Sequence, residues 1–92
     1  MQINISYLSQ LKKAAGVPQE SISVENPCTV QQLLSDMVCP RRVQLCKTIR
    51  NADGSFREIL LVFVGDRQVD LTTPFQLDDG DEITVMFPIA GG

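Results

Sequence analysis

The sequence contains no histidine among its 92 residues. Histidine is the usual general base of enzymes, a frequent metal ligand and the usual partner of a serine or cysteine nucleophile. Its absence argues against a self-sufficient hydrolase and removes a common ligand of zinc sites. We therefore expect a protein that is not an enzyme and that holds neither a metal nor a cofactor.

Cysteine is also scarce. The three cysteines, Cys28, Cys39 and Cys46, form an odd set, whereas small secreted scaffolds carry a denser and even one. They lie eleven and seven residues apart, and this spacing fits neither a zinc site nor an iron–sulfur cluster. We interpret them as scattered, small, semi-apolar residues in a reducing compartment. The alternative that one of them relays sulfur remains open.

Aromatic residues and positive charge are too few for a nucleic-acid interface. The chain has four Phe, one Tyr and no Trp, and its eight Lys and Arg are outnumbered by eleven Asp and Glu. Nucleic-acid binders show a basic surface with stacking aromatics. No apolar run approaches the roughly 20 residues that span a bilayer, and the N-terminus has no signal-like pattern. We expect a cytoplasmic protein with neither nucleic acid nor a membrane as partner.

With 43% apolar and 21% charged residues, the overall composition is that of one globular domain, which we expect to span residues 1–92. Alternating apolar residues predict strands over 2–7 and 20–24. Between them, Ser9 is expected to cap a short helix, and Gly16 is expected to end it in a left-handed conformation.

A longer helix is predicted from Thr29 onward, because Thr29 and Gln32 stand at the spacing of a capping box. Pro40 predicts that this helix stops near Cys39, and whether residues 41–46 form a further turn is left open. The helix carries one apolar stripe made of Val30, Leu33, Leu34, Met37 and Val38.

In the second half of the chain, the sequence pattern predicts strands and turns. Residues 51–54 form a turn signal before a strand over 58–64, in which six consecutive residues are apolar. A short segment over 68–71 and a last strand over 82–87 follow. The acidic cluster around Gly80 is interpreted as a turn, with a contact to a basic partner as an addition.

This order of elements predicts an α+β fold of the ubiquitin-like β-grasp class, a mixed sheet of four to five strands packed on one main helix. The first and last strands are expected side by side in the middle of the sheet. The last strand leads through Phe87 and Pro88 to Ala90, Gly91 and Gly92. Because glycine has no Cβ, a flexible Gly-Gly tail can enter a narrow channel and deliver a terminal carboxylate.

The sequence resembles the sulfur-carrier proteins of the molybdopterin-synthase small-subunit and thiamin-biosynthesis type. The resemblance covers nearly the whole chain, and its landmarks are the opening strand, LKKAAG over 11–16, TVQQL over 29–33, LDDGDEI over 77–83 and FPIAGG over 87–92. The length and the Phe-Pro approach to the tail favour the molybdopterin branch.

The resemblance implies that an E1-like enzyme uses ATP to adenylate Gly92 and that a persulfide donor converts it to a thiocarboxylate. Gly91 and Gly92 match the family's functional tail, which in the molybdopterin branch inserts into the large subunit of the synthase. Alternatives are sulfur delivery to thiamin, cysteine or another thiolated metabolite, a ubiquitin-like protein modifier that forms isopeptide bonds, and an interaction module with an idle tail.

A partner surface is predicted on the outer side of the sheet. It rests on the apolar run containing Leu60, Val62 and Phe63 and on Met86, with Phe63 as an alternative core residue. Near the tail, the predicted partner-binding residues are Phe87, Pro88 and Ala90.

Overall fold

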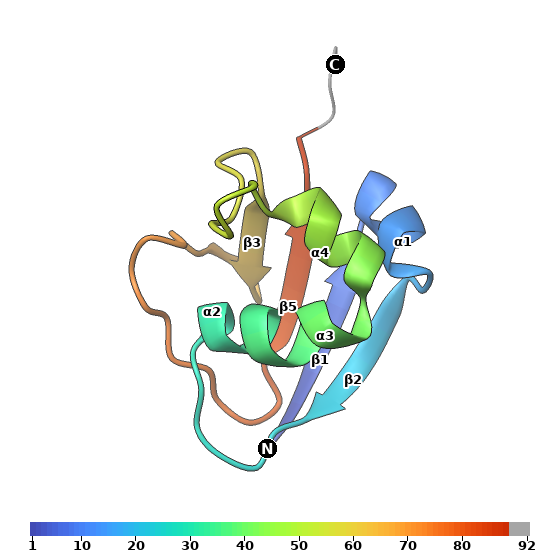
Figure 1. Cartoon of the computed structure of the whole chain (residues 1–92). Helices are drawn as coiled ribbons and strands as arrows, with labels where there is room; N and C mark the ends of the chain where they lie inside the picture. The colour runs from blue at the N-terminus through green and yellow to red at the C-terminus, as the bar shows by residue number, and fades with distance from the viewer. Residues whose placement is uncertain (89–92) are drawn as a thin grey trace.

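The computed structural model describes residues 1–88 and contains one mixed sheet with the strand order β2-β1-β5-β3-β4 (Figure 1). The first and last strands pair in parallel at its centre, and the other neighbouring strands are antiparallel. The predicted fold class and the predicted central pairing are therefore confirmed. The strands are β1 Gln2–Tyr7, β2 Gln19–Ser23, β3 Leu61–Val64, β4 Arg67–Gln68 and β5 Glu82–Met86.

The opening hairpin follows the alternation of the sequence, with Ile3, Ile5 and Tyr7 fully buried. Helix α1, Gln10–Ala15, connects its two strands and ends at Gly16, whose φ of 83° is left-handed as predicted. The predicted Ser9 cap is wrong, because its side chain accepts no capping hydrogen bond. A capping residue normally has an extended backbone, whereas Ser9 has φ 54° and ψ −134°.

The main helix begins with the predicted capping box. The Gln32 amide donates to Thr29 Oγ1 over 3.1 Å, and the Thr29 amide donates to Gln32 Oε1 over 2.9 Å. The helical path then has three consecutive parts: α2 Val30–Gln32, the π-helical η1 Leu33–Val38 and α3 Cys39–Arg41.

This helix does not stop near Cys39 as predicted but continues past Pro40 to Arg41. The cause is the π-helical turn, in which the Cys39 amide donates to the carbonyl of Leu34, five residues earlier. The wider turn moves the preceding carbonyls away from the proline ring, which would clash with them in a regular α-helix. A further helix, α4 Val43–Ile49, settles the question that the sequence left open over 41–46.

The predicted strand over 58–64 is shorter in the structure and comprises only β3. The Leu60 amide donates to the Arg57 carbonyl over 3.0 Å and closes a turn at residues 58–59. Ile59 is therefore 44% exposed rather than part of the sheet. The segment expected over 68–71 reduces to β4, and β5 ends at Met86, one residue earlier than predicted.

The helices cover one face of the sheet, as Figure 1 shows, and the core lies between the two layers. No helix within residues 1–88 is long and apolar enough to cross a membrane. The largest fully buried side chains come from both layers and are Tyr7, Ile3, Ile5, Leu11, Ile22, Leu33, Leu34, Leu45, Ile49, Ile83, Val30 and Val38.

Candidate functional site at the end of strand β5

Strand β5 carries the chain from the middle of the sheet to the end of the molecule opposite the N-terminus (Figure 1). It is held on both sides, by the parallel ladder with β1 and the antiparallel ladder with β3. The last pair of the β3–β5 ladder joins Leu61 and Met86. The segment that follows Met86 therefore leaves from a strand that is hydrogen-bonded on both sides.

Phe87 anchors the point of exit. Its side chain is only 3% exposed and belongs to the core. The guanidinium carbon of Arg57 lies 5.3 Å from the centroid of the ring, within the range of a cation–π contact. Arg57 was not predicted from the sequence, because the 58–59 turn that positions it was predicted as strand. The buried Phe87 thus anchors the point of exit, and its role in partner binding stays a prediction.

Pro88 is exposed and has no N–H to donate to a neighbouring strand. It therefore marks the boundary between the sheet and the segment that carries the predicted chemistry. The predicted site residues Ala90, Gly91 and Gly92 lie outside the described residues, so their roles stay predictions.

The outer face of the sheet, which the helices do not cover, has an apolar half over β3 and β5. Directly opposite residues of an antiparallel pair share a face, and the register pairs Leu61 with Met86 and Phe63 with Thr84. Leu61, Phe63 and Met86 are each partly exposed. Phe63 and Met86 thus lie on the outer face, and Leu61 is a neighbour that the sequence analysis did not single out. Leu60 and Val62, in contrast, are core residues.

The other half of the outer face, over β1 and β2, is polar. There the Ser21 hydroxyl donates to Asn4 Oδ1 over 2.6 Å. A shallow hollow of about 510 Å³ lies on this half and is lined by Asn4, Ser6, Gln19, Glu20, Ser21, Glu82 and Thr84. The apolar contribution to the outer face therefore comes from the β3–β5 half.

A charged cluster fastens the α3–α4 corner to the opening hairpin. Tyr7 donates its hydroxyl to Glu20 over 2.5 Å, and the Arg42 guanidinium donates to both carboxylate oxygens of Glu20 over 3.0 and 3.1 Å. Partial burial alone would raise the pKa of Glu20, but the hydrogen bonds from Arg42 and Tyr7 lower it. Burial and the hydrogen bond to Glu20 raise the pKa of Tyr7. The cluster therefore holds an ionised Glu20 beside a neutral Tyr7.

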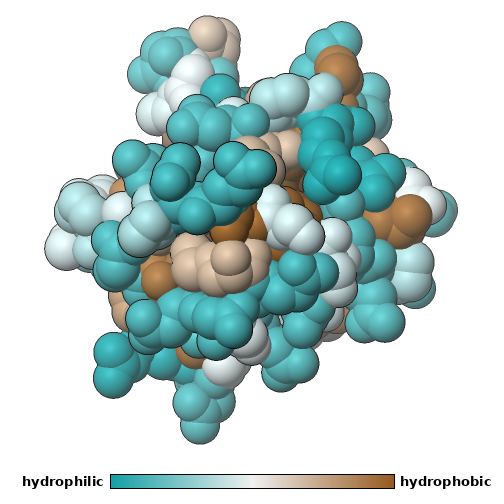
Figure 2. Space-filling view, turned by 90° about the horizontal axis from the view of Figure 1, so that it is seen from below, coloured by the Kyte–Doolittle hydropathy of each residue, from teal (hydrophilic) through white to brown (hydrophobic). Residues whose placement is uncertain are grey.

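The acidic segment around Gly80 is a turn, as predicted. Gly80 has φ 86°, the Asp78 amide donates to Asp81 Oδ2 over 2.8 Å, and the Gln2 amide donates to Asp79 Oδ1 over 2.6 Å. In residues 1–88 no group of three or more His, Cys, Asp or Glu side chains is placed to hold a metal ion. Figure 2 views this end of the molecule from below, and hydrophilic residues predominate around a small hydrophobic area.

The sheet order, the parallel central pair and the covering helices define a ubiquitin-like β-grasp protein. No family model matches the chain, and no curated protein matches it. Solved structures do match, and at 21–22% identity they show the fold, which is the fold that the sequence resemblance implied.

These solved structures include the following, which span nearly all of this chain. SAMP1 from Haloferax volcanii has a TM-score of 0.89 at 21% identity, with 100% of both chains covered. The putative molybdopterin converting factor, subunit 1, from Pyrococcus furiosus has a TM-score of 0.75 at 21% identity, covering 97% of this chain and 99% of that one. A chain of the BexX/CysO complex from Amycolatopsis orientalis has a TM-score of 0.71 at 22% identity, covering 98% and 99%.

Proposed function

We propose that this protein is a cytoplasmic sulfur carrier that works through the carboxylate of Gly92. An E1-like enzyme adenylates the carboxylate with ATP, and a sulfur donor converts the acyl-adenylate to a thiocarboxylate. The acceptor is the molybdopterin precursor held by a synthase large subunit, into which the tail inserts. The chain itself supplies no catalysis and no cofactor.

The observation that carries this proposal is the anchoring of Phe87 beside the exposed Pro88. A buried ring fixes the direction in which the chain leaves the central strand, and the proline ends the ladder immediately afterwards. Four residues separate Pro88 from the end of the sequence, and the last two are glycines. The anchored Phe87 and the exposed Pro88 thus give a fixed starting point to a tail that a partner enzyme can thread into its active site.

The likeness in fold to the putative molybdopterin converting factor, subunit 1, from Pyrococcus furiosus supports sulfur delivery in molybdopterin synthesis. The likeness to a chain of the BexX/CysO complex and to CysO from Mycobacterium tuberculosis supports the alternative of sulfur transfer to another metabolite. The proposed partner surface is the apolar half of the outer face together with Pro88 and Ala90.

The test is mass spectrometry of the protein isolated from its own host. The protein is treated with a thiol-alkylating reagent and digested with trypsin, and the peptide over 68–92 is weighed. This peptide contains no cysteine, so an alkyl group on it reports a thiocarboxylate, whereas oxidised Met86 does not react. An alkylated peptide is the expected result, and a variant without Gly92 is the control. A peptide that never carries the alkyl group under sulfur limitation would overturn the proposal.

A second candidate is a ubiquitin-like modifier, because the Haloferax volcanii neighbour is described as small archaeal modifier protein 1. Activated Gly92 would then form isopeptide bonds with lysines of other proteins. This candidate predicts adducts of high mass on denaturing gels that disappear when Gly92 is deleted. Adducts together with an unalkylated tail would favour the modifier over the sulfur carrier.

A further inference from the structure

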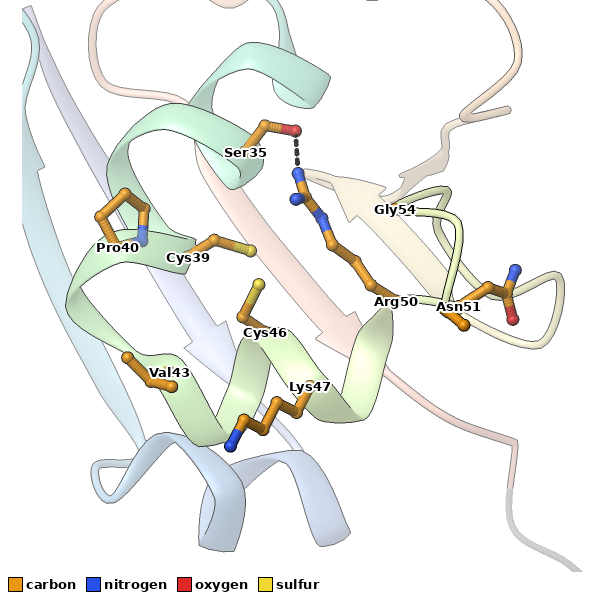
Figure 3. Close-up of a pocket in the computed structure, with 10 residues that line it drawn as sticks. Ser35, Cys39, Pro40, Val43, Cys46, Lys47, Arg50, Asn51 and Gly54 are labelled. Atoms are coloured by element: carbon orange, nitrogen blue, oxygen red, sulfur yellow. Dashed lines mark hydrogen bonds between the residues drawn. The ribbon is translucent and has the colours of Figure 1, made fainter.

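The structure brings together two cysteines that the sequence analysis treated as scattered. Cys39 begins α3 and Cys46 lies in α4. Between them Arg42 has φ −124° and ψ 73°, which turns α4 back along α3. The two sulfur atoms consequently point toward each other (Figure 3). Cys28 lines a different hollow, ahead of α2.

The cysteine pair lies in the wall of a surface hollow with a volume of about 690 Å³. Cys39 is 6% exposed, whereas Cys46 is only partly buried. A small reagent such as a peroxide that enters this hollow can therefore reach Cys46 first, with Cys39 behind it. This difference in access gives the two thiols different roles.

The hollow also contains a positive group with an unused donor. Arg50 donates from Nη2 to Ser35 Oγ over 2.5 Å, but its Nε is buried and has no hydrogen-bond partner within residues 1–88. A buried N–H without an acceptor is unfavourable. Both cysteine sulfurs point toward the side of the hollow that Arg50 occupies (Figure 3). A sulfur anion formed at the pair would supply a negatively charged acceptor beside this donor.

The environment also disfavours the loss of the Cys39 proton. Burial and the hydrogen bond with Cys46 raise the pKa of Cys39 to about 12, although the charge of Arg50 opposes the shift. The buried Cys39 is thus disfavoured as a thiolate, and Cys46 is the more accessible of the two sulfurs for a reagent in the hollow.

We propose that Cys39 and Cys46 form a site of reversible oxidation, in which Cys46 reacts with a hydroperoxide and Cys39 resolves the product. With hydrogen peroxide as the oxidant, the Cys46 thiolate attacks one oxygen, the O–O bond breaks, and Cys46 becomes a sulfenic acid. The departing hydroxide takes up the proton that the thiol released and leaves as water. Cys39 then displaces the hydroxyl group, so that an S–S bond forms, the S–O bond breaks and a second water leaves. The two thiols lose two electrons and the peroxide gains them. No residue of β5 or of the tail takes part, so this site is independent of the proposed function.

The experiment treats the reduced full-length protein with hydrogen peroxide and then alkylates the remaining thiols. Cys28→Ser serves as the reference protein, because one tryptic peptide over 14–41 contains both Cys28 and Cys39. The expected product is a monomer that has lost two hydrogens and accepts no alkyl group. Digestion should link the peptides over 14–41 and 43–47, and dithiothreitol should separate them.

Two further variants are made in the Cys28→Ser background. With Cys39→Ala, which keeps a small apolar side chain in the core, Cys46 should accumulate as a sulfenic acid that dimedone labels. With Cys46→Ser, the rate of reaction with peroxide should fall by about tenfold or more, because the accessible nucleophile is gone. Arg50→Met, which removes the buried N–H and the charge, should slow the reaction by about threefold to tenfold.

Several results would overturn the proposal. One is a reaction rate for Cys46→Ser equal to that of the reference protein, measured on variants whose circular dichroism matches it. Another is a disulfide that joins two chains instead of the two peptides of one chain. A third is the alkylation of both cysteines after treatment with excess peroxide.

Discussion

Arg57 and Phe87 are in cation–π contact, with the guanidinium carbon 5.3 Å from the centroid of the ring. The backbone of Arg57 is fixed independently, because its amide donates to the Ile49 carbonyl over 2.9 Å. The contact thus connects the end of α4 to the residue after β5. The contact therefore links the point at which the chain leaves the sheet to α4, which lies in the helical layer.

We predict that Phe87→Ala lowers the free energy of unfolding by about 3–5 kcal/mol, the usual cost of removing a buried aromatic ring. Urea denaturation monitored by circular dichroism measures this change. The matched control, Arg57→Met, keeps the side-chain stem over the ring and should cost only about 0.5–1 kcal/mol. If the two variants were equally destabilised, the guanidinium and not the ring would be the main anchor.

Glu20 should make the stability of the protein sensitive to acid. Because its pKa is lower in the folded state, its contribution is present above the unfolded-state pKa of about 4.3 and is lost as the pH falls through the folded-state pKa. We predict that Glu20→Gln lowers stability by about 1–3 kcal/mol at pH 7. Urea midpoints between pH 2 and 7 should converge for the two proteins at the acid end. A constant difference across that range would contradict the assignment.

Tyr7 should make the stability of the protein sensitive to alkaline pH. Burial and the hydrogen bond to Glu20 raise its folded-state pKa, so its contribution is present below the unfolded-state pKa of about 10 and is lost as the pH rises through the folded-state value. We predict that Tyr7→Phe costs about 1 kcal/mol at pH 7 and flattens the fall in stability above pH 10. Thermal unfolding from pH 7 to 11 measures both effects. If the stability of Tyr7→Phe fell above pH 10 as steeply as that of the unmodified protein, groups other than Tyr7 would cause the fall.

The apolar half of the outer face should bind the adenylating enzyme. We predict that Phe63→Asp and Met86→Asp retain the fold and weaken binding to that enzyme by about tenfold or more, since each places a charge in a desolvated contact. Isothermal titration calorimetry measures the affinity. Ser6→Asp, on the polar half of the same face, is the matched control. Wild-type affinity in both folded variants would show that this surface is not the contact.

The capping box should contribute measurably to the main helix. Thr29→Ala removes the acceptor for the Gln32 amide and should cost about 1 kcal/mol. Thr48→Ala is the control, because the Thr48 hydroxyl donates to the Gln44 carbonyl inside α4, where its loss should cost less than about 0.5 kcal/mol. Chemical denaturation of both variants separates the two effects. An equal cost would mean that the cap is replaced by water.

The sequence predicted those elements whose cause is local. The alternation of Ile3 and Ile5 was sufficient for β1, and the spacing of Thr29 and Gln32 was sufficient for the start of the main helix. Gly16 likewise ends α1 because of its own backbone freedom. In each case a few neighbouring residues determine the conformation, so the pattern can be read without knowing the tertiary structure.

The elements that were mispredicted or left open depend on structure that a local sequence pattern does not report. Pro40 was expected to end the helix, but the π-helical turn before it accommodates the ring, and a proline alone does not report that turn. The direction of α4 follows from Arg42, whose guanidinium binds Glu20 on the opening hairpin. The proximity of Cys39 and Cys46 follows in turn from that direction. The position of Arg57 over Phe87 is a contact of the same non-local kind.

The place of β5 in the sheet also constrains how the protein assembles during synthesis. A chain that has been translated only to residue 81 contains the β1–β2 and β3–β4 pairs but lacks the strand that hydrogen-bonds one pair to the other. Because the joining strand is made last, neither pair can complete the core while the ribosome still holds residues 82–86. Folding of this domain is therefore an event that follows translation of its final strand.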